Sequence, residues 1–362
     1  MQEDRLVQTF LDLIKIDSPS GHEEKVREYV VQFVEKLGLK AIQDARGNLI
    51  VKVDGLGEPL LLGAHLDTVE PGRNIKPQIK DGIIRSSGDT ILGADNKAAI
   101  AAILEILKDF IKNKLQISSL DIVFTLSEEN GEFGSSKLDY EKISAKKGYI
   151  FDNENPIGTV IISSPFYYSF NIKIIGKGVH ASMPERGVNA LGILGKALNN
   201  IRLGKINHKT IANIGIINGG HARNSIPAEI FTEGEVRSFI GEEAKGYLGF
   251  IIEKFKECAG KLGGKIEYSF VCESPGYKYR KNDELVVQVK NVFKSLNIRP
   301  SLKSSWACSD ANIFNLHGIK TINLSEGIVG AHTINESVSV KNLKMLSKLI
   351  FSLVTPLHAT HI

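Results

Sequence analysis

The sequence of 362 residues predicts an α/β protein, in which a mixed, mostly parallel sheet flanked by helices is interrupted by a smaller ferredoxin-like α+β domain. Three observations lead to this fold class. Short apolar runs of strand length alternate with amphipathic stretches of helical length in the first and last parts of the chain. Several of these apolar runs end at, or within three residues of, a His, Asp or Glu. The middle of the chain follows a different order, strand–helix–strand–strand–helix–strand, which is that of a ferredoxin-like unit.

The spacing of apolar residues predicts the first elements. Apolar residues at helical intervals indicate amphipathic helices over residues 3–16 and 22–37. Residues 39–53 contain two apolar stretches around a turn sequence, and they are expected to form two strands. The apolar run at 59–62 then predicts a buried strand that ends at His65.

The next segment continues this alternation. A long, alanine-rich helix is expected over 96–113, and Asp95 stands where its N-cap belongs. Further apolar runs predict strands over 121–126 and 148–151. The side chains that follow these two strands are acidic: Glu128, Glu129 and Asp152.

The middle of the chain is predicted to be an inserted domain. The expected division is a discontinuous domain over 1–165 and 276–362, with the insertion over 166–275. Clusters of Ser, Pro and Gly lie at both boundaries. Within the insertion, the expected strands are 169–176, 210–218, 229–239 and 265–272, and the expected helices are 189–201 and 242–262.

The last part of the chain returns to the first pattern. The expected elements are a helix over 283–296, a short helix over 310–316, a strand over 320–324 and a terminal helix over 340–354. Between this strand and the last helix, a glycine-rich loop over 327–332 ends in His332. A histidine in such a loop after a buried strand is a better ligand candidate than an isolated surface histidine.

His65 and Asp67 are the first candidate site residues. Residues two apart in a strand point to the same side, so the imidazole and the carboxylate are expected to face one way. An imidazole is a good ligand for zinc or a similar ion, and a carboxylate beside it can fix its tautomer. Taken alone, the pair could equally be a loop-capping pair.

Three predicted strands in succession end in imidazole or carboxylate side chains, and Asp95 opens a helix between two of them. In open α/β sheets, ligands bind outside the carboxyl ends of the strands. The side chains are therefore expected to converge, and the pattern favours a metal site over solvated surface charges. The simpler interpretation of Asp95, an ordinary N-cap, stays open at this point.

The motifs together resemble the dinuclear zinc exopeptidase and aminoacylase family, which includes peptidase T, carboxypeptidase G and the succinyl-diaminopimelate desuccinylases. The matching segments are GAHLDT at 63–68, GADNK at 93–97, SEE at 127–129, Asp152, GVHASMP at 178–184, and His332. They extend along nearly the whole chain in order. The GADNKA sequence and the Phe151–Asp152 pair are most similar to the peptidase T branch.

This resemblance implies a role for each motif residue. Asp95 would bridge two divalent metal ions, zinc in the first place, with cobalt or manganese as alternatives. The remaining ligands would be His65 and Asp152 on one ion, and Glu129 and His332 on the other. Asp67 would orient His65, and Glu128 would be the general base and acid. The family also tends to have a cis peptide bond after the bridging aspartate.

For the insertion, the resemblance implies a lid and dimerisation domain that carries substrate-binding residues. His180 would help to hold the oxyanion, often across a dimer, and Asn224 and Arg237 match substrate-binding positions. An Arg suits a substrate carboxylate through bidentate contact. The alternatives are a turn histidine at His180 and a surface ion pair at Arg237.

The composition excludes several other functions. The net charge of +4 is spread along the chain without a basic block, so nucleic acid is not an expected partner. No apolar run reaches the roughly 20 residues needed to span a membrane. Three cysteines without metal-type spacing and a polar start fit a cytoplasmic protein.

The predicted function is that of a metal-dependent exopeptidase acting on short peptides, and a peptidase T-like tripeptide aminopeptidase is the first choice. Alternatives within the family are a carboxypeptidase or an N-acyl-amino-acid deacylase. An alternative from another class is a catalytically silent, metal-holding binding protein. A homodimer through the insertion is a further expectation from the resemblance.

Overall fold

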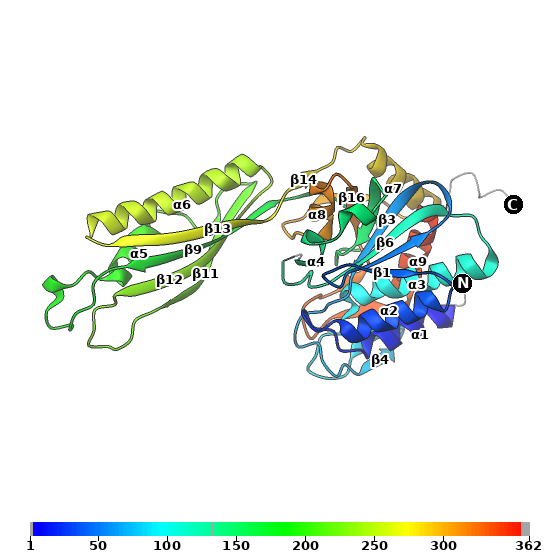
Figure 1. Cartoon of the computed structure of the whole chain (residues 1–362), viewed down its shortest axis with the longest axis horizontal. Helices are drawn as coiled ribbons and strands as arrows, with labels where there is room; N and C mark the ends of the chain where they lie inside the picture. Colours follow the sequence, from blue (N-terminus) through cyan, green and yellow to red (C-terminus); the bar gives the residue numbers. More distant parts are fainter. Residues whose placement is uncertain (1–2, 132, 356–362) are drawn as a thin grey trace. The chain divides into compact units, whose positions relative to one another are not determined.

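The computed structural model describes residues 3–131 and 133–355, which form two compact units (Figure 1). Unit 1 consists of the described residues of Met1–Ile162, Lys278–Ser304 and Ser309–Ile362. Unit 2 consists of Ser163–Tyr277 and a short return segment, Ser305–Cys308.

The centre of unit 1 is a nine-stranded sheet, counted over the described residues, with the order β1-β2-β6-β3-β7-β16-β8-β14 and β15 paired to β8. The prediction of a mixed sheet is confirmed. The four central strands, β6-β3-β7-β16, run parallel, while β1, β2 and β8 pair antiparallel. The strands are β1 (Ala41–Gln43), β2 (Leu49–Val53), β3 (Leu56–His65), β6 (Ser118–Thr125), β7 (Lys147–Phe151), β8 (Thr159–Ser164), β14 (Tyr277–Lys278), β15 (Ser301–Ser304) and β16 (Lys320–Leu324).

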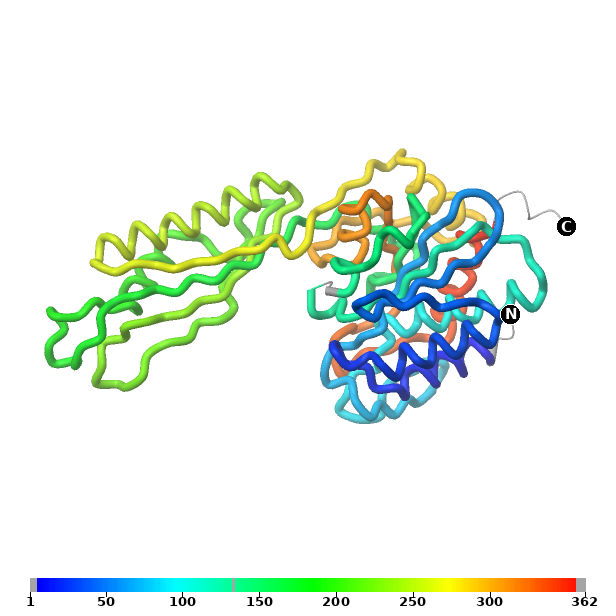
Figure 2. Tube along the Cα trace, viewed as in Figure 1, coloured from blue at the N-terminus to red at the C-terminus, as the bar shows by residue number. Residues whose placement is uncertain are grey.

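Helices surround this sheet. Helix α3 (Ala94–Asn113) is the innermost, because its side chains are buried along almost its whole length. It packs against α1 and α9, and Figure 2 shows the blue N-terminal helices beside the cyan α3. The other helices of unit 1 are α1 (Glu3–Ile14), α2 (Glu24–Glu35), α4 (Phe133–Ser136), α7 (Glu284–Ser295), α8 (Asp310–Leu316), α9 (Val340–Val354) and the 3-10 turn η1 (Tyr140–Lys142).

Unit 1 also contains a small antiparallel sheet that the sequence did not predict. Its order is β17-β18-β5-β4, formed by β4 (Pro77–Lys80), β5 (Ile83–Ser86), β17 (Ile328–Val329) and β18 (Ser337–Ser339). These strands are too short for a clear alternating pattern. The sheet matters because β17 and β18 flank the loop that carries His332.

Unit 2 has the predicted βαββαβ order, with a two-residue strand, β10 (Gly204–Lys205), added. The sheet order is β10-β11-β12-β9-β13, and α5 and α6 pack on one face of it over a core that includes Phe170, Ile172 and Phe255. The other elements are β9 (Phe166–Ile175), the 3-10 turn η2 (Pro184–Arg186), α5 (Ala190–Asn199), β11 (Thr210–Gly219), β12 (Glu229–Ser238), α6 (Gly241–Lys261) and β13 (Lys265–Ser274).

No helix among residues 3–131 and 133–355 combines the length and the apolar character that a membrane crossing requires.

Candidate metal centre

The carboxyl ends of three adjacent parallel strands form the floor of the candidate site. Strand β3 ends at His65, which lies opposite Thr125 at the end of β6. Residues 127–129 follow β6, and Asp152 follows β7 on the other side of β3. Because parallel strands end at the same edge of a sheet, segments far apart in the sequence deliver their polar side chains to one place.

Asp95 lies between two histidines. One carboxylate oxygen, Oδ1, is 3.1 Å from His65 Nε2, and the other, Oδ2, is 3.3 Å from His332 Nε2. Asp95 has a non-helical backbone (φ −76°, ψ 106°), and the expected cis peptide bond, Asp95–Asn96, is present. The side chain therefore does not act as a simple helix cap, because each of its oxygens faces a different imidazole.

His332 reaches the same place from the β17–β18 loop. Its Nε2 is 2.8 Å from Glu129 Oε1, and half of its side chain is exposed. His332 has a positive φ of 63°, which turns the backbone at this position. The loop thus brings His332 beside two acidic residues, Asp95 and Glu129, that precede it in the sequence by about two hundred positions or more.

Asp67 holds both His65 and the glutamate segment. His65 Nδ1 is 3.0 Å from the Asp67 carbonyl oxygen and 3.3 Å from Asp67 Oδ1. The backbone N–H groups of Glu128 and Glu129 donate to the Asp67 carboxylate, at 3.0 and 3.1 Å. A single buried carboxylate therefore fixes the imidazole ring and the backbone of the two neighbouring glutamates.

Glu128 and Glu129 belong to different clusters of ligand-type atoms. Ligand atoms of His65, Glu128 and Asp152 all lie within 4.8 Å of one another, and so do those of His65, Asp95 and Glu129. Glu128 and Glu129 lie in a bend and a turn after β6, and their carboxyl groups reach different neighbours.

The crowding of carboxyl groups changes their acidity. Burial, followed by the charge of Asp152, raises the pKa of Glu128 well above its usual value. Burial and the charge of Asp95 do the same to the pKa of Asp152. For Asp95, burial opposes ionisation, but the hydrogen bonds from His332 and His65 prevail and lower the pKa. Hydrogen bonds to Asp95 and Glu129 raise the pKa of His332 to about 10.

The donor set fits two divalent cations. Carboxylate and imidazole groups are ligands that zinc and similar ions accept. Three carboxylates, Asp95, Glu129 and Asp152, would offset most of the charge of two dications. The decisive feature is Asp95, because its two oxygens face different imidazoles as a bridging ligand requires.

Several residues that support this site were not predicted. Ser20 Oγ donates to Asp67 at 2.6 Å, and buried Glu23 accepts from both the backbone N–H and the hydroxyl of Ser127. Asn323 holds the backbone of Asp152 on both sides, at 3.1 and 2.6 Å. Their sequence context, a loop and a strand interior, contains no motif that marks such a role.

Asp310 is a second unexpected neighbour. Ser309 is the N-cap of α8, and Asp310 is the first residue of this helix. Asp310 is also buried, accepts a hydrogen bond from Thr125 Oγ1 at 2.5 Å, and contributes to the raised pKa of Glu128. The carboxyl group of Asp310 therefore belongs to the electrostatic surroundings of the site.

In unit 2, His180 and Asn224 lie together. The Asn224 carbonyl accepts from Ala181 N at 2.9 Å, and His180 pairs with Ser225 in an isolated bridge. His180 is exposed, and its Nδ1 accepts from the backbone N–H of Ser182 at 3.2 Å. In the neutral ring this leaves the proton on Nε2, which is free to donate to a ligand.

Arg237 lies at the other end of the unit 2 sheet. His180 follows the end of β9 and Asn224 precedes β12, whereas Arg237 pairs with Tyr167 at the start of β9. The guanidinium of Arg237 donates to Glu235 at 3.0 and 3.2 Å and to the Trp306 carbonyl at 3.0 Å. Unit 2 therefore does not bring the three predicted substrate-binding residues together.

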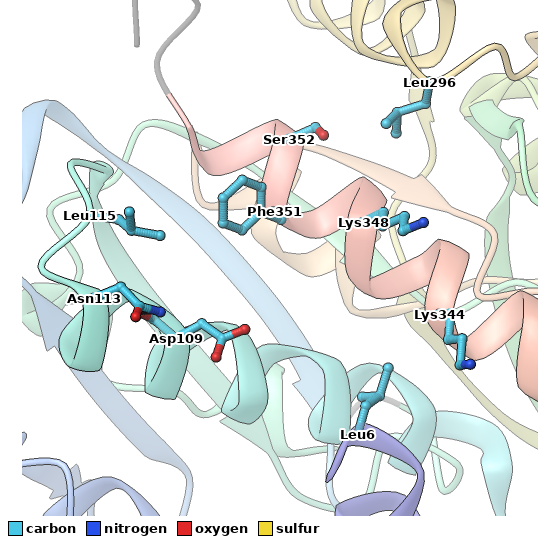
Figure 3. Close-up of a pocket in the computed structure, with 9 residues that line it drawn as sticks. All are labelled: Leu6, Asp109, Asn113, Leu115, Leu296, Lys344, Lys348, Phe351 and Ser352. Atoms are coloured by element: carbon cyan, nitrogen blue, oxygen red, sulfur yellow. Dashed lines mark hydrogen bonds between the residues drawn. The ribbon is translucent and has the colours of Figure 1, made fainter. Parts of the chain in front are cut away.

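A cavity of about 360 Å³ lies elsewhere in unit 1 (Figure 3). Figure 3 shows side chains of α9 facing those of α1 and α3 across it. Its lining residues are Leu6, Asp109, Asn113, Leu115, Leu296, Lys344, Lys348, Phe351 and Ser352. None of them is a candidate site residue, so the acidic cluster and not this cavity is the candidate active site.

The comparison with known proteins agrees with the geometry of the site. The model of the peptidase family M20/M25/M40 matches residues 61–355. The chain belongs to this family. As an M20 family member, it is a hydrolase that acts on peptide bonds.

Several known proteins are similar over nearly the whole chain. A tripeptidase from Staphylococcus aureus is 34% identical with a TM-score of 0.95, and aminopeptidase PepT from Bacillus cereus is 33% identical with a TM-score of 0.91. In both comparisons, 98% of each chain is covered. An uncharacterized protein of Bacillus subtilis, YqjE, is 32% identical over 365 residues, with 98% of each chain covered.

Proposed function

We propose that this protein is a metal-dependent aminopeptidase that hydrolyses tripeptides. The observation that carries the proposal is the position of Asp95 between His65 and His332, with Glu128 close to His65. Similarity to a tripeptidase and to an aminopeptidase over the whole chain supports the choice of substrate.

Two divalent ions would be held by five side chains. Asp95 would be shared, with His65 and Asp152 completing one site and Glu129 and His332 the other. When bound, such ions supply Lewis acidity and lower the pKa of a water molecule. Zinc is the proposed metal, and cobalt and manganese suit the same donor set.

Glu128 would hold and move the proton. Its carboxyl group lies close to His65 and Asp152 but is not one of the five proposed ligands. Burial raises its pKa, so it keeps a proton more readily than an ordinary glutamate. A general base that accepts the proton of a water at its carboxylate can then donate that proton to the leaving amine.

Asp67 would keep His65 in the required tautomer. Its carbonyl and carboxylate oxygens face His65 Nδ1, which keeps the ring proton there and leaves Nε2 for a ligand role. Because Asp67 also accepts from the Glu128 backbone, it orients the proposed base as well.

The candidates in unit 2 suggest that a site contains residues from two copies of the chain. His180 would donate from Nε2 to the oxyanion with Asn224 beside it, and Arg237 would contact the substrate carboxylate. These groups lie at opposite ends of ten-residue strands, which are about 30 Å long. One copy therefore cannot place all three on one tripeptide, whereas a homodimer can.

Strand β13 is the proposed contact between the copies. It is a ten-residue edge strand with Tyr268 and Phe270 exposed by 44% and 45%. An exposed, partly apolar edge is a template for pairing with another strand. If β13 of two copies pairs antiparallel about Ser269, Tyr268 of each copy lies opposite Phe270 of the other, which gives two equivalent aromatic pairs. It would also bring the His180 end of one sheet beside the Arg237 end of its partner.

Cross-linking tests this register. A Ser269→Cys variant, in a Cys272→Ser background, should form a disulfide-linked dimer under mild oxidation. In the proposed register, position 269 of one copy lies opposite position 269 of the other. Val271→Cys in the same background is the matched control and should remain uncross-linked. A wild-type protein that sediments as a monomer would overturn the dimer, and a dimer without the Ser269→Cys cross-link would overturn the register.

Hydrolysis of a small substrate panel tests the activity. The metal-loaded protein is assayed on tripeptides with free and with blocked amino ends, and on N-acyl amino acids. Cleavage that requires a free amino end is the expected result. Cleavage of blocked peptides or N-acyl compounds would instead identify a carboxypeptidase or deacylase. Two bound ions without any turnover would identify a silent binding protein.

A further inference from the structure

Glu336 connects the two loops that carry Asp95 and His332. It lies four residues after His332, directly before β18, and only 1% of it is exposed. Its Oε2 accepts from Gly93 N at 2.7 Å, and its Oε1 accepts from Asp95 N at 3.0 Å. The backbone N–H of Ala94 is a third donor to the same carboxylate.

These contacts act on the backbone that aims Asp95. Gly93 has a φ of 68°, and the backbone becomes helical only after Asn96. This turn cannot rely on helical hydrogen bonds at its first residues. Glu336 supplies the acceptors instead, with one carboxyl oxygen for Gly93 N and the other for Asp95 N.

The other end of the connection is fixed by the small sheet. Ser337, next to Glu336, pairs with Arg85 of β5 and with Val329 of β17. Glu336 N donates to Thr333 O at 3.0 Å, which closes the loop around His332. The carboxylate therefore bonds to the turn of Asp95 while its backbone belongs to the loop of His332.

We propose that Glu336 is a positioning residue, which sets the separation between Asp95 Oδ2 and His332 Nε2 so that both groups can hold the same ion. Its side chain bonds to the backbone N–H groups of Gly93 and Asp95, and it is not one of the five proposed ligands. The proposal rests on the proposed metal centre and adds a function for a residue outside it. Loss of its contacts should weaken chiefly the ion shared by Asp95, Glu129 and His332.

Glu336→Gln tests the proposal, because glutamine has nearly the same size as glutamate. Its amide group offers one acceptor oxygen to the backbone N–H donors, whereas the carboxyl group of Glu336 offers two. Metal-free protein is titrated with Co²⁺ and followed by calorimetry and by visible absorption. Wild type should bind two ions. In Glu336→Gln, the affinity for one ion should fall roughly 10–100-fold, as for other residues that hold metal ligands in place. The affinity for the other ion should change much less, and excess Co²⁺ should restore hydrolysis.

Asp121→Asn is the matched control. Asp121 is 2% exposed, accepts from the backbone of Ser144 and Ala145, and lies in the first half of β6, four residues before the strand ends at Thr125. The Asp121→Asn variant should have a lower melting temperature than the wild type, with both Co²⁺ affinities unchanged. If Glu336→Gln does not fold, Glu336→Asp is used, which keeps the charge but shortens the reach.

Two ions bound by Glu336→Gln with wild-type affinities, together with only a lower melting temperature, would overturn the proposal. Equal weakening of both ions would do so as well. A wild-type protein that binds fewer than two Co²⁺ ions would instead contradict the proposed metal centre, so the two failures are distinguishable.

Discussion

The candidate residues of unit 1 and unit 2 differ in how completely their own unit assembles them. In unit 1, residues from five separate segments lie close together, and all of them except His332 are buried or half-buried. In unit 2, His180 and Asn224 are exposed at one end of the sheet while Arg237 lies at the other. The charged side chains of the unit 1 cluster contact one another, so the fold of that unit alone assembles them. The exposed residues at the two ends of the unit 2 sheet would need a second copy of the chain before they could contact one substrate.

The burial of the unit 1 cluster has an energetic consequence. Several carboxyl groups with raised pKa values share a small volume, which is unfavourable unless cations compensate them. In unit 2, the charge of Arg237 is already paired with Glu235 at 3.0 Å. Unit 1 is therefore expected to depend on metal ions for its stability, and unit 2 is not.

The largest expected effect follows from Glu128→Gln. Removing a general base typically lowers the rate by about 10²–10⁴-fold, and glutamine keeps the shape of the side chain. We expect kcat to fall by this amount while two metal ions remain bound, as measured by hydrolysis assays and metal analysis. Glu154→Gln, a substitution in the loop after Asp152, is the control. Activity that survives Glu128→Gln would show that the proton is held elsewhere.

His180→Ala tests whether the substrate-binding candidates of unit 2 act on the substrate. Removal of one hydrogen-bond donor to an oxyanion costs about 10²–10³-fold in kcat, and the metal content should not change. Mixing the His180→Ala and Glu128→Gln variants should then restore about a quarter of the wild-type activity. This follows because half of the dimers are mixed and each mixed dimer holds one intact site.

The absence of restored activity in that mixture, although subunits exchange, would mean that His180 acts within its own copy or not at all. Subunit exchange is checked with the two variants carrying different affinity tags. Unchanged activity of His180→Ala alone would assign the residue a local role, namely its contact with Ser182.

Metal removal should lower the stability of unit 1 and leave that of unit 2 unchanged. A ligand present at about 100 times its Kd stabilises the folded state by roughly 2.7 kcal/mol. A chelator should therefore speed hydrogen exchange in β3, β6 and β7, while β9 and β12 of unit 2 should keep their protection. Asp95→Asn is the control, because its exchange should respond little to the chelator. Equal loss of protection in both units would show that unit 1 does not depend on metal ions more than unit 2 does.

The smallest expected effect concerns His317, a histidine of unit 1 outside the site. It stacks on Tyr140 with ring centroids 3.7 Å apart, and partial burial lowers its pKa from 6.5. The unfolded chain then binds a proton more readily than the folded chain, so its small contribution to stability is present above pH 6.5 and is lost as the pH falls towards the folded pKa.

An NMR titration of His317 should give a pKa below 6.5, in contrast to the raised value of His332 in the same unit. His317→Gln should remove this part of the pH dependence of unfolding and leave the hydrolysis rate unchanged. A His317 pKa at or above 6.5 would show that its partial burial does not favour the neutral ring.

Much of the fold was predictable because local patterns and the final structure agree. The apolar run before His65, the alanine-rich stretch after Asp95 and the βαββαβ order of unit 2 all became the expected elements. The small sheet was missed because its strands have two to four residues, too few to show a period. Strand direction was also only partly predictable, since pairing between distant segments decides which neighbours run parallel.

The sequence by itself determined the types of groups in the site and their order along the chain. Spacing within one strand placed His65 and Asp67 on the same side, and the motif resemblance suggested a role for each residue. Only the tertiary structure decided that one oxygen of Asp95 faces His65 and the other faces His332. It also decided that Glu336 bonds to the turn of Asp95 and that Arg237 is paired with Glu235. The physical reason is the separation of the interacting residues along the chain. Local spacing fixes the side to which a residue points, whereas the packing of the whole fold determines which distant residues come into contact.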